Sequence, residues 1–175
     1  HKGATMTRLE ALQVGIDSLK YNQETGELVW VKGRSDRVGK VAGNVDSSGY
    51  RKIMVKGHNF RAHRICWVIA YGSEAANEID HINGLKHDNR LCNLREATRS
   101  ENCMNMKVRS DNKSGFKGVY WREHAKRFTA SIWKDGKRKT LGYFDTAEQA
   151  HKSYIQASIN IHGEFANIGV ENGNR

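Results

Sequence analysis

The chain has no run of about 18 consecutive apolar residues and no signal-peptide pattern, so we expect neither a membrane-spanning helix nor export, but a cytoplasmic protein. Its three cysteines, Cys66, Cys92 and Cys103, form no Cys-x-x-Cys pair, which indicates free thiols in a reducing compartment. The paired four-ligand spacing of structural zinc sites is also missing, so zinc is not an expected cofactor.

Acidic residues are scarce relative to basic ones. The 175 residues include 29 Lys and Arg against 19 Asp and Glu, which gives a net charge of +10. A surplus of this size attracts polyanions and speeds encounter with them, so we expect a nucleic acid as partner. Hydrophobic residues make up 38% of the chain, and its length suits one domain or two small ones with modest cores.

Residues 7 to 72 show several signals of secondary structure. Leu9, Leu12 and Ile16 have helical spacing, and a hairpin is expected around Glu24-Thr25-Gly26-Glu27. The remaining elements expected here are strands at Leu28–Val31 and Tyr50–Lys56 and a buried helix at Arg61–Tyr71 that ends at Gly72.

The most informative stretch runs from Ile79 to Asn105. Asp80 can supply a carboxylate oxygen to a hard cation. His81 follows it on an extended strand, points to the opposite face and so need not compete for that ion. A histidine is also well suited to take a proton from an attacking water near neutral pH. Asn102 can bring a second oxygen ligand from another element.

The local structure of this stretch can be predicted from the same residues. Asn83-Gly84 is a strong turn signal after a short strand at Glu78–Ile82. Thr98-Arg99-Ser100-Glu101 is a capping box, which predicts a helix from Thr98 with Asn102 just beyond its first turn. Strand, loop and helix would make a compact ββα unit.

This arrangement resembles the HNH nuclease family, and specifically the phage-type HNH endonucleases that include homing endonucleases. The likeness extends upstream to His63-Arg64-Ile65-Cys66-Trp67 and spans roughly residues 50 to 106. It implies a ββα-metal fold, also called the His-Me finger, and cleavage that leaves 5′-phosphate and 3′-hydroxyl ends.

The resemblance also assigns roles to individual side chains. It implies that Asp80 and Asn102 hold the metal, that His81 is the general base and that Asn93 braces the loop. The third letter of the family name is Asn102 here instead of histidine. Because an oxygen donor at this place suits hard octahedral ions, we expect one Mg²⁺ or Mn²⁺ in the active site and no zinc.

The region after residue 115 carries a second pattern. Val119–Arg122, Arg127–Lys134 and Lys137–Tyr143 are predicted strands, the last two joined by an Asp135-Gly136 turn, and a capping box at Asp145-Thr146-Ala147-Glu148 opens a helix. Strand alternation turns one set of side chains away from that helix. The set is Tyr120, Arg122, Arg127, Thr129, Ser131, Trp133, Arg138 and Thr140. A basic and aromatic face of this kind suits contact with a DNA groove.

This region looks like the plant Apetala2/ethylene-response-factor DNA-binding domain. The likeness rests on Gly118-Val119, Ala130-Ser131-Ile132, Leu141-Gly142-Tyr143-Phe144-Asp145-Thr146-Ala147-Glu148-Gln149-Ala150 and Ala166-Asn167. Ser131 and Trp133 replace the usual Glu and Arg of the second strand, and Tyr120 replaces an Arg of the first. The target sequence of the plant proteins should therefore not be carried over.

The expected organisation has two domains. The nuclease domain spans residues 7–106, with its ββα-metal core at about 78–106, and the Apetala2-like domain spans 116–168 as a three-stranded antiparallel sheet packed on one helix. The fold class is thus α+β. Residues 107–115 form a basic linker, in which Lys107, Arg109 and Lys113 either follow the DNA backbone or keep the linker extended.

The sequence predicts a metal-dependent, site-specific endonuclease of the homing type that acts on double-stranded DNA. One active site per chain favours a monomer that nicks one strand. The alternative is a sequence-specific DNA-binding regulator in which the HNH unit is only a scaffold, and charge alone also allows a structured RNA as ligand. Metal-dependent relaxation of a plasmid separates the first two, and competition between duplex DNA and RNA tests the third.

Overall fold

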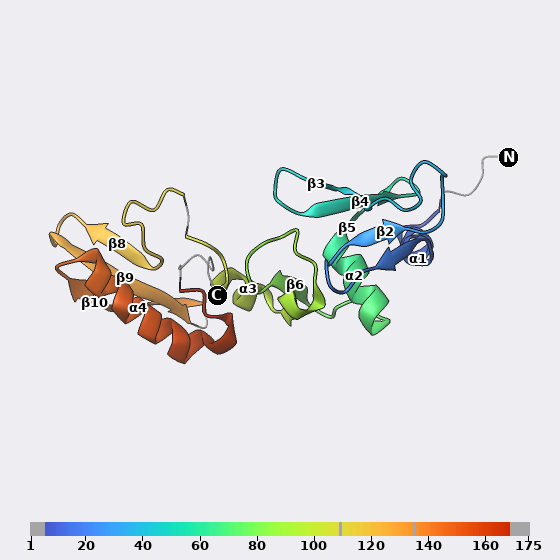
Figure 1. Cartoon of the computed structure of the whole chain (residues 1–175). Helices are drawn as coiled ribbons and strands as arrows, with labels where there is room; N and C mark the ends of the chain where they lie inside the picture. The colour runs from blue at the N-terminus through green and yellow to red at the C-terminus, as the bar shows by residue number, and fades with distance from the viewer. Residues whose placement is uncertain (1–5, 109, 135, 169–175) are drawn as a thin grey trace. The chain divides into compact units, whose positions relative to one another are not determined.

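A computed structural model of the chain describes residues 6–108, 110–134 and 136–168 (Figure 1). The described residues form small antiparallel sheets and helices in two compact units that divide between Thr98 and Arg99. This confirms the mixed α+β class. No helix in the described part is both long and apolar enough to cross a membrane.

The first unit contains α1 (Arg8–Ser18), β1 (Leu19–Tyr21), β2 (Leu28–Trp30), β3 (Asn44–Val45), β4 (Arg51–Val55), β5 (His58–Arg61), α2 (Ala62–Tyr71), β6 (Glu78–His81), the 3₁₀ turn η1 (Leu91–Asn93) and β7 (Leu94–Ala97). The second contains α3 (Arg99–Met104), β8 (Val119–Arg122), β9 (Arg127–Lys134), β10 (Lys137–Phe144), α4 (Ala147–His162) and the 3₁₀ turn η2 (Gly163–Phe165). Strands are ordered β1-β2, β3-β4-β5, β6-β7 and β10-β9-β8.

Helix α1 begins with a reciprocal cap. The Thr7 hydroxyl accepts from the Glu10 backbone at 3.3 Å, and the Glu10 carboxylate accepts from the Thr7 backbone at 2.7 Å. The predicted apolar stripe is only partly correct, because Leu9 is 73% exposed whereas Leu12 is buried. The buried face is completed by small residues, Ala11 and Gly15.

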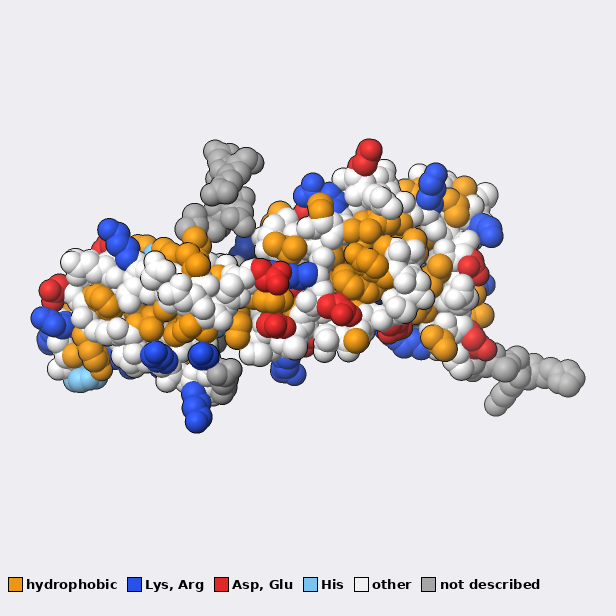
Figure 2. Space-filling model, turned by 90° about the horizontal axis from the view of Figure 1, so that it is seen from below, with side chains coloured by type: hydrophobic (Ala, Val, Ile, Leu, Met, Phe, Trp, Pro, Cys, Tyr) orange, Lys and Arg blue, Asp and Glu red, His pale blue; other side chains and the backbone are white. Residues whose placement is uncertain are grey.

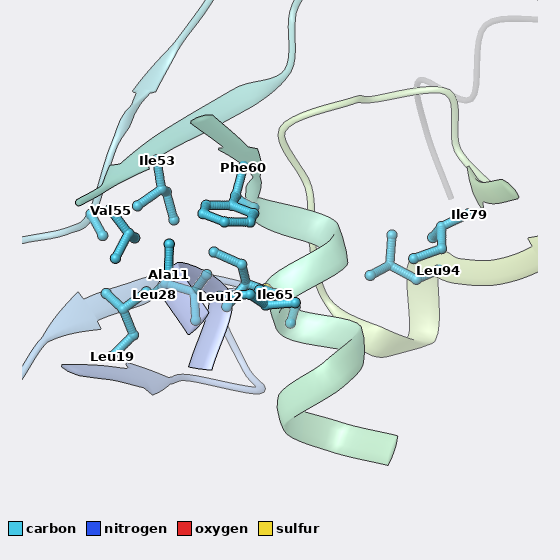
Figure 3. Close-up of a cluster of buried hydrophobic side chains, with 13 residues drawn as sticks. Ala11, Leu12, Leu19, Leu28, Ile53, Val55, Phe60, Ile65, Ile79 and Leu94 are labelled. Carbon is cyan, nitrogen blue, oxygen red and sulfur yellow. The ribbon is translucent and has the colours of Figure 1, made fainter. Parts of the chain in front are cut away.

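A single hydrophobic core holds the first unit together (Figure 3). Leu28, Ile53 and Ile65 are fully buried and come from a hairpin, a sheet and a helix that are far apart in sequence. Ile79 of β6 and Leu94 of β7 pack onto the same core. The β6–β7 ribbon is therefore fixed by burial, and the two polar residues that end β6 are held in place with it.

The second unit packs α4 along one face of the β10-β9-β8 sheet (Figure 1). Val119, Ala130 and Ile132 of the sheet meet Ala150 and Tyr154 of the helix in its core. Thr146 caps α4 by accepting from the Gln149 backbone at 3.2 Å, and the helix ends at Gly163. The predicted strands agree with these bounds to within one residue, although Asp135 of the predicted turn lies outside the described residues.

One irregularity in β10 was not predicted. The register shifts between Thr140 and Gly142, so that Thr140 pairs with Ser131 but Tyr143 pairs with Thr129. An extra residue in one strand reverses the alternation beyond it. As a result, Tyr143 joins the face of the sheet that is turned away from α4.

Candidate active site and nucleic-acid interface

Asp80 is held by an arginine on the neighbouring strand. β6 and β7 pair so that Asp80 lies opposite Arg95, whose Nε and one terminal nitrogen donate to Asp80 Oδ2 at 3.0 and 2.9 Å. Asp80 is 5% exposed. A buried carboxylate needs such compensation, because desolvation strongly disfavours an unpaired charge. Arg95 was missed at the sequence level, and only the register of the two strands reveals it.

His81 contacts a different set of groups. Its Nε2 lies 3.2 Å from the amide oxygen of Asn89, and both side chains are buried. Burial lowers the pKa of His81 below its ordinary value, and the hydrogen bond with Asn89 partly opposes that shift. The imidazole is therefore neutral near pH 7 and able to accept a proton.

Two further rings surround His81. The ring centroid of His63 lies 5.1 Å away and that of Tyr50 lies 5.9 Å away, both in edge-on arrangements. Burial, together with nearby positive groups, lowers the pKa of His63 to about 3, so this ring is neutral as well. His63 is buried, and its contact with the His81 ring limits the movement of that ring.

The loop between β6 and β7 is braced by side-chain amides. Asn93 accepts from the Asn83 backbone at 2.9 Å and donates to the Asp88 carbonyl at 2.8 Å. Asn83 in turn donates to the Asp88 carboxylate at 2.8 Å. Arg90, followed by Asn83, holds the pKa of Asp88 at about 2, so this carboxylate stays charged. These bonds agree with the bracing expected of Asn93, whereas its part in catalysis stays a prediction.

The position of Asn89 is set by the N-terminal hairpin. The Tyr21 hydroxyl donates to the Asn89 carbonyl at 2.9 Å and accepts from the Leu91 backbone at 3.1 Å. Gly26 has a positive φ of 74°, and a Cβ there would lie 2.5 Å from the Arg90 backbone nitrogen. Only glycine allows this close approach without displacement. The sequence did not identify Asn89, Tyr21 or Gly26 as residues that shape the site.

Asn102 lies on α3, which belongs to the second unit by its contacts. The sequence predicts this helix from Thr98, and in the structure it begins one residue later, at Arg99. The expected nuclease domain runs through residue 106, whereas the two compact units divide before Arg99. The structure thus brings Asp80, His81 and the Asn93 loop together in the first unit, and the role of Asn102 as a metal ligand stays a prediction.

The outer face of the β10-β9-β8 sheet shows the expected mixture of aromatic and basic groups. Tyr120 and Trp133 are 45% and 59% exposed. The Arg138 guanidinium lies 4.8 Å from the Tyr120 ring centroid and donates to the Ser131 hydroxyl at 2.8 Å. This stacking fixes the direction of Arg138. The bulge in β10 adds Tyr143, which is 52% exposed and was missed from the sequence.

The other predicted DNA-contacting residues fall into three groups. Thr129 and Ser131 are on this face but buried, and the Thr129 hydroxyl donates to the Gly142 carbonyl at 3.1 Å. Charged residues at the ends of the strands are more open, with Arg127 paired to Asp145 at 3.2 Å. The residues Arg122, Thr140, Lys107 and Lys113 are exposed or half-exposed, and Arg109 lies outside the described residues. Lys and Arg side chains are spread over both units on the face drawn in Figure 2.

Comparison with known proteins identifies two domains in the chain. Residues 60–104 match the HNH endonuclease family model, and residues 114–164 match that of the AP2 domain. Protein 3.8 of Escherichia phage T7 is 33% identical over 107 residues, which are 61% of this chain and 88% of the phage protein. The chain therefore belongs to the same family as this phage protein. No solved structure matches it.

The HNH and AP2 domains follow one another in the predicted order. The HNH match includes Asp80, His81 and α3, and the AP2 match includes β8 to α4. An HNH domain combined with an AP2 domain supports a DNA-binding nuclease. HNH nucleases generally depend on a divalent metal ion, which agrees with the oxygen ligands expected here.

Proposed function

We propose that this HNH–AP2 protein is a metal-dependent, site-specific DNA endonuclease of the homing type that nicks one strand of a duplex. The observation that carries the proposal is the buried pair of His81 and Asn89, next in sequence to the carboxylate of Asp80. A structural scaffold has no need for a neutral, oriented imidazole beside an arginine-held carboxylate. Both features suit hydrolysis of a phosphodiester.

His81 would act as the general base. An amide oxygen only accepts hydrogen bonds, so its contact with Asn89 Oδ1 requires the proton of the imidazole to be on Nε2. That tautomer has its lone pair on Nδ1, which is the nitrogen able to take a proton from water. The rings of His63 and Tyr50 restrict the imidazole to this orientation. Positioning of this kind is what general-base catalysis requires.

The donor set fits a hard divalent ion. Asp80 offers a carboxylate whose orientation is fixed by Arg95, and Asn102 offers an amide oxygen. Oxygen donors favour one Mg²⁺ or Mn²⁺ over Zn²⁺. When bound, such an ion supplies positive charge for the phosphate and for the leaving 3′ oxygen. Cleavage would leave a 5′-phosphate and a 3′-hydroxyl.

The AP2 domain would select the site on double-stranded DNA. Its outer face has the three exposed aromatic rings of Tyr120, Trp133 and Tyr143, and the guanidinium of Arg138 lies over Tyr120. A planar guanidinium fixed in this way can read a guanine edge or bind a phosphate. One site per chain suits a monomer that cuts a single strand. We propose Lys107, Arg109 and Lys113 as additional phosphate contacts.

The proposal can be tested with a supercoiled plasmid library that carries random duplex inserts. With Mg²⁺ or Mn²⁺ we expect nicked circles at selected sites, and EDTA should stop the reaction. His81→Ala should lower the cleavage rate by roughly 10²–10⁴-fold without loss of DNA affinity, because the base acts only in the chemical step. His87→Ala, which changes an exposed histidine of the same loop, is the matched control.

The second candidate is a DNA-binding regulator with a non-catalytic HNH scaffold. It predicts that the wild type binds duplex DNA but does not nick it in Mg²⁺, Mn²⁺ or Zn²⁺. Cleavage by His81→Ala at the wild-type rate, or full activity in EDTA, would contradict the endonuclease mechanism instead.

A further inference from the structure

Helix α3 is short and has no buried residue. It has six residues, and its last turn contains no basic residue to complement the helix dipole. A helix this short is unstable in isolation, and the carbonyls at its C-terminal end have no partners within the helix. A pocket of about 560 Å³ is lined by Cys103 of α3 and by Trp133 of the sheet. Because no side chain of α3 is fully buried, apolar burial contributes little to its stability.

Lys117 contacts the C-terminal end of this helix. Its ammonium donates to the Met104 carbonyl at 2.6 Å and to the Met106 carbonyl at 2.6 Å, so it caps the end of α3 from a position 13 residues further along the chain. The side chain is half-buried, and this burial lowers the pKa of Lys117 to about 8. Hydrogen bonds from a charged donor are the stronger kind.

The backbone that carries Lys117 is rigid. Gly118 has a φ of 72°, and a Cβ there would lie 2.1 Å from the Tyr154 ring. Its carbonyl accepts from the Ser131 backbone at 2.9 Å, and Val119 is fully buried. Lys117 therefore projects from a fixed point at the start of β8.

A second side chain, that of Asn167, forms a hydrogen bond with the same segment. The amide nitrogen of Asn167 donates to the Asn105 carbonyl at 2.7 Å. The carbonyls of three successive residues, 104 to 106, thus receive donors from Lys117, near the start of the AP2 match, and from Asn167, just beyond its end. Residues near the two ends of the AP2 domain therefore bind the segment that ends α3.

We propose that Lys117 is a positioning residue for the nuclease, acting through α3 on Asn102. The inference rests on the proposed function, because it takes Asn102 as a metal ligand. It adds a second role for the AP2 domain besides DNA binding. Residues near its two ends would set the direction of the helix that carries Asn102, the proposed metal ligand. Loss of the Lys117 ammonium should therefore weaken metal binding even when DNA binding is intact.

The test compares Lys117→Met, which keeps the stem and removes the charge, with Lys152→Met, an exposed lysine on α4. We expect Lys117→Met to raise the Mn²⁺ concentration needed for half-maximal cleavage by about tenfold, from the loss of a charged hydrogen bond. Calorimetric Mn²⁺ binding should weaken by a similar factor, and the Kd for duplex DNA should stay within about twofold of wild type. Lys117→Arg should recover part of the Mn²⁺ affinity.

Amide hydrogen exchange gives a readout that does not depend on activity. The amides of Asn105 and Met106 donate to Glu101 and Cys103 within the helix end, so they should exchange faster in Lys117→Met. Asn167→Ala should shift exchange and Mn²⁺ binding in the same direction, which keeps the test decisive if Lys117→Met fails to fold. In an Asn102→Ala background, Lys117→Met should cause no additional loss of Mn²⁺ binding.

The outcomes separate the two claims. A wild type that never cleaves DNA would refute the proposed function and, with it, the role of Asn102. A wild type that cleaves, together with Lys117→Met and Asn167→Ala variants that keep wild-type Mn²⁺ binding and amide exchange, would overturn only the positioning role of Lys117.

Discussion

The side chains of His81 and Asn89 meet at 3.2 Å although they come from a strand and a loop eight residues apart. Asn89 is 1% exposed, and its amide nitrogen has no hydrogen-bond partner among the described residues. A buried polar group without a partner is costly and is uncommon away from functional sites. Asn89 is therefore best explained by what its oxygen does for His81.

Replacement of Asn89 tests this relationship. Asn89→Leu keeps the approximate size of the side chain but removes the acceptor, so the His81 tautomer is no longer fixed. We expect cleavage to fall at least about tenfold and stability to fall by roughly 1–3 kcal/mol, because the Nε2 proton loses its partner. The nitrogen-15 shifts of His81 should change from a single tautomer toward a mixture. Unchanged shifts in a less active protein would point to a different role for Asn89.

Gly26 offers a test of how the hairpin supports the loop. Gly26→Ala places a Cβ against the Arg90 backbone, so Arg90 and Asn89 must move. Gly39→Ala is a matched control, because its φ of 83° is similar but no atom lies within 4 Å of the new Cβ. Both changes should cost about 1 kcal/mol of stability from the unfavourable φ. Only Gly26→Ala should also lower the cleavage rate, measured as single-turnover nicking; equal rates for the two variants would contradict the support role.

His63 predicts a pH dependence of stability. Its folded pKa of about 3 lies below the unfolded value near 6.5, so the unfolded state binds more protons between these limits. The free energy of unfolding of the first unit should therefore fall as the pH drops below about 6.5, with a slope of up to about 1.4 kcal/mol per pH unit.

Urea titrations followed by NMR signals of the first unit would measure this slope. His63→Phe keeps an aromatic ring and should reduce the slope, leaving the contribution of His81, whose pKa burial also lowers. His87→Gln should leave the slope unchanged because that side chain is exposed. A wild-type stability that is flat between pH 7 and 4 would show that His63 protonates without difficulty in the folded protein.

Arg138 predicts how the AP2 domain binds DNA. Arg138→Met removes the guanidinium that lies over Tyr120, and affinity for the selected site should fall by about 1–3 kcal/mol if it reads a base edge. If it contacts a phosphate, the salt dependence of binding should instead decrease by about 0.9 in slope. Arg138→Lys should not retain the contact, since lysine lacks the planar guanidinium that stacks on the Tyr120 ring. Affinity and salt dependence equal to those of Lys152→Met would exclude Arg138 from the interface.

The second unit could be predicted closely because its signals are local. The alternation of β9 and the cap at Thr146 each depend on neighbouring residues, and the structure confirms both. The bulge in β10 could not be predicted in this way, since it depends on pairing with β9. Gly142, with a φ of 151°, is the one local sign of it.

The candidate site was only partly visible in the sequence. Asp80 and His81 form a recognisable motif, but their partners are defined by tertiary contacts. Arg95 depends on the register of a strand pair, and Asn89 sits in a loop without periodicity. Tyr21 is 68 residues from the carbonyl that it binds, and no pattern along the chain links the two.

The contacts of the β1–β2 hairpin with the Asn89 backbone have a consequence for protein engineering. The HNH match begins at residue 60, but the groups that support Asn89 are Tyr21 and Gly26. A chimaera that transplants only residues 60–104 would receive Asp80 and His81 without the contacts that shape the loop after them. The smallest portable nuclease cassette must therefore start upstream of β1, and loop insertions between β1 and β2 should be avoided.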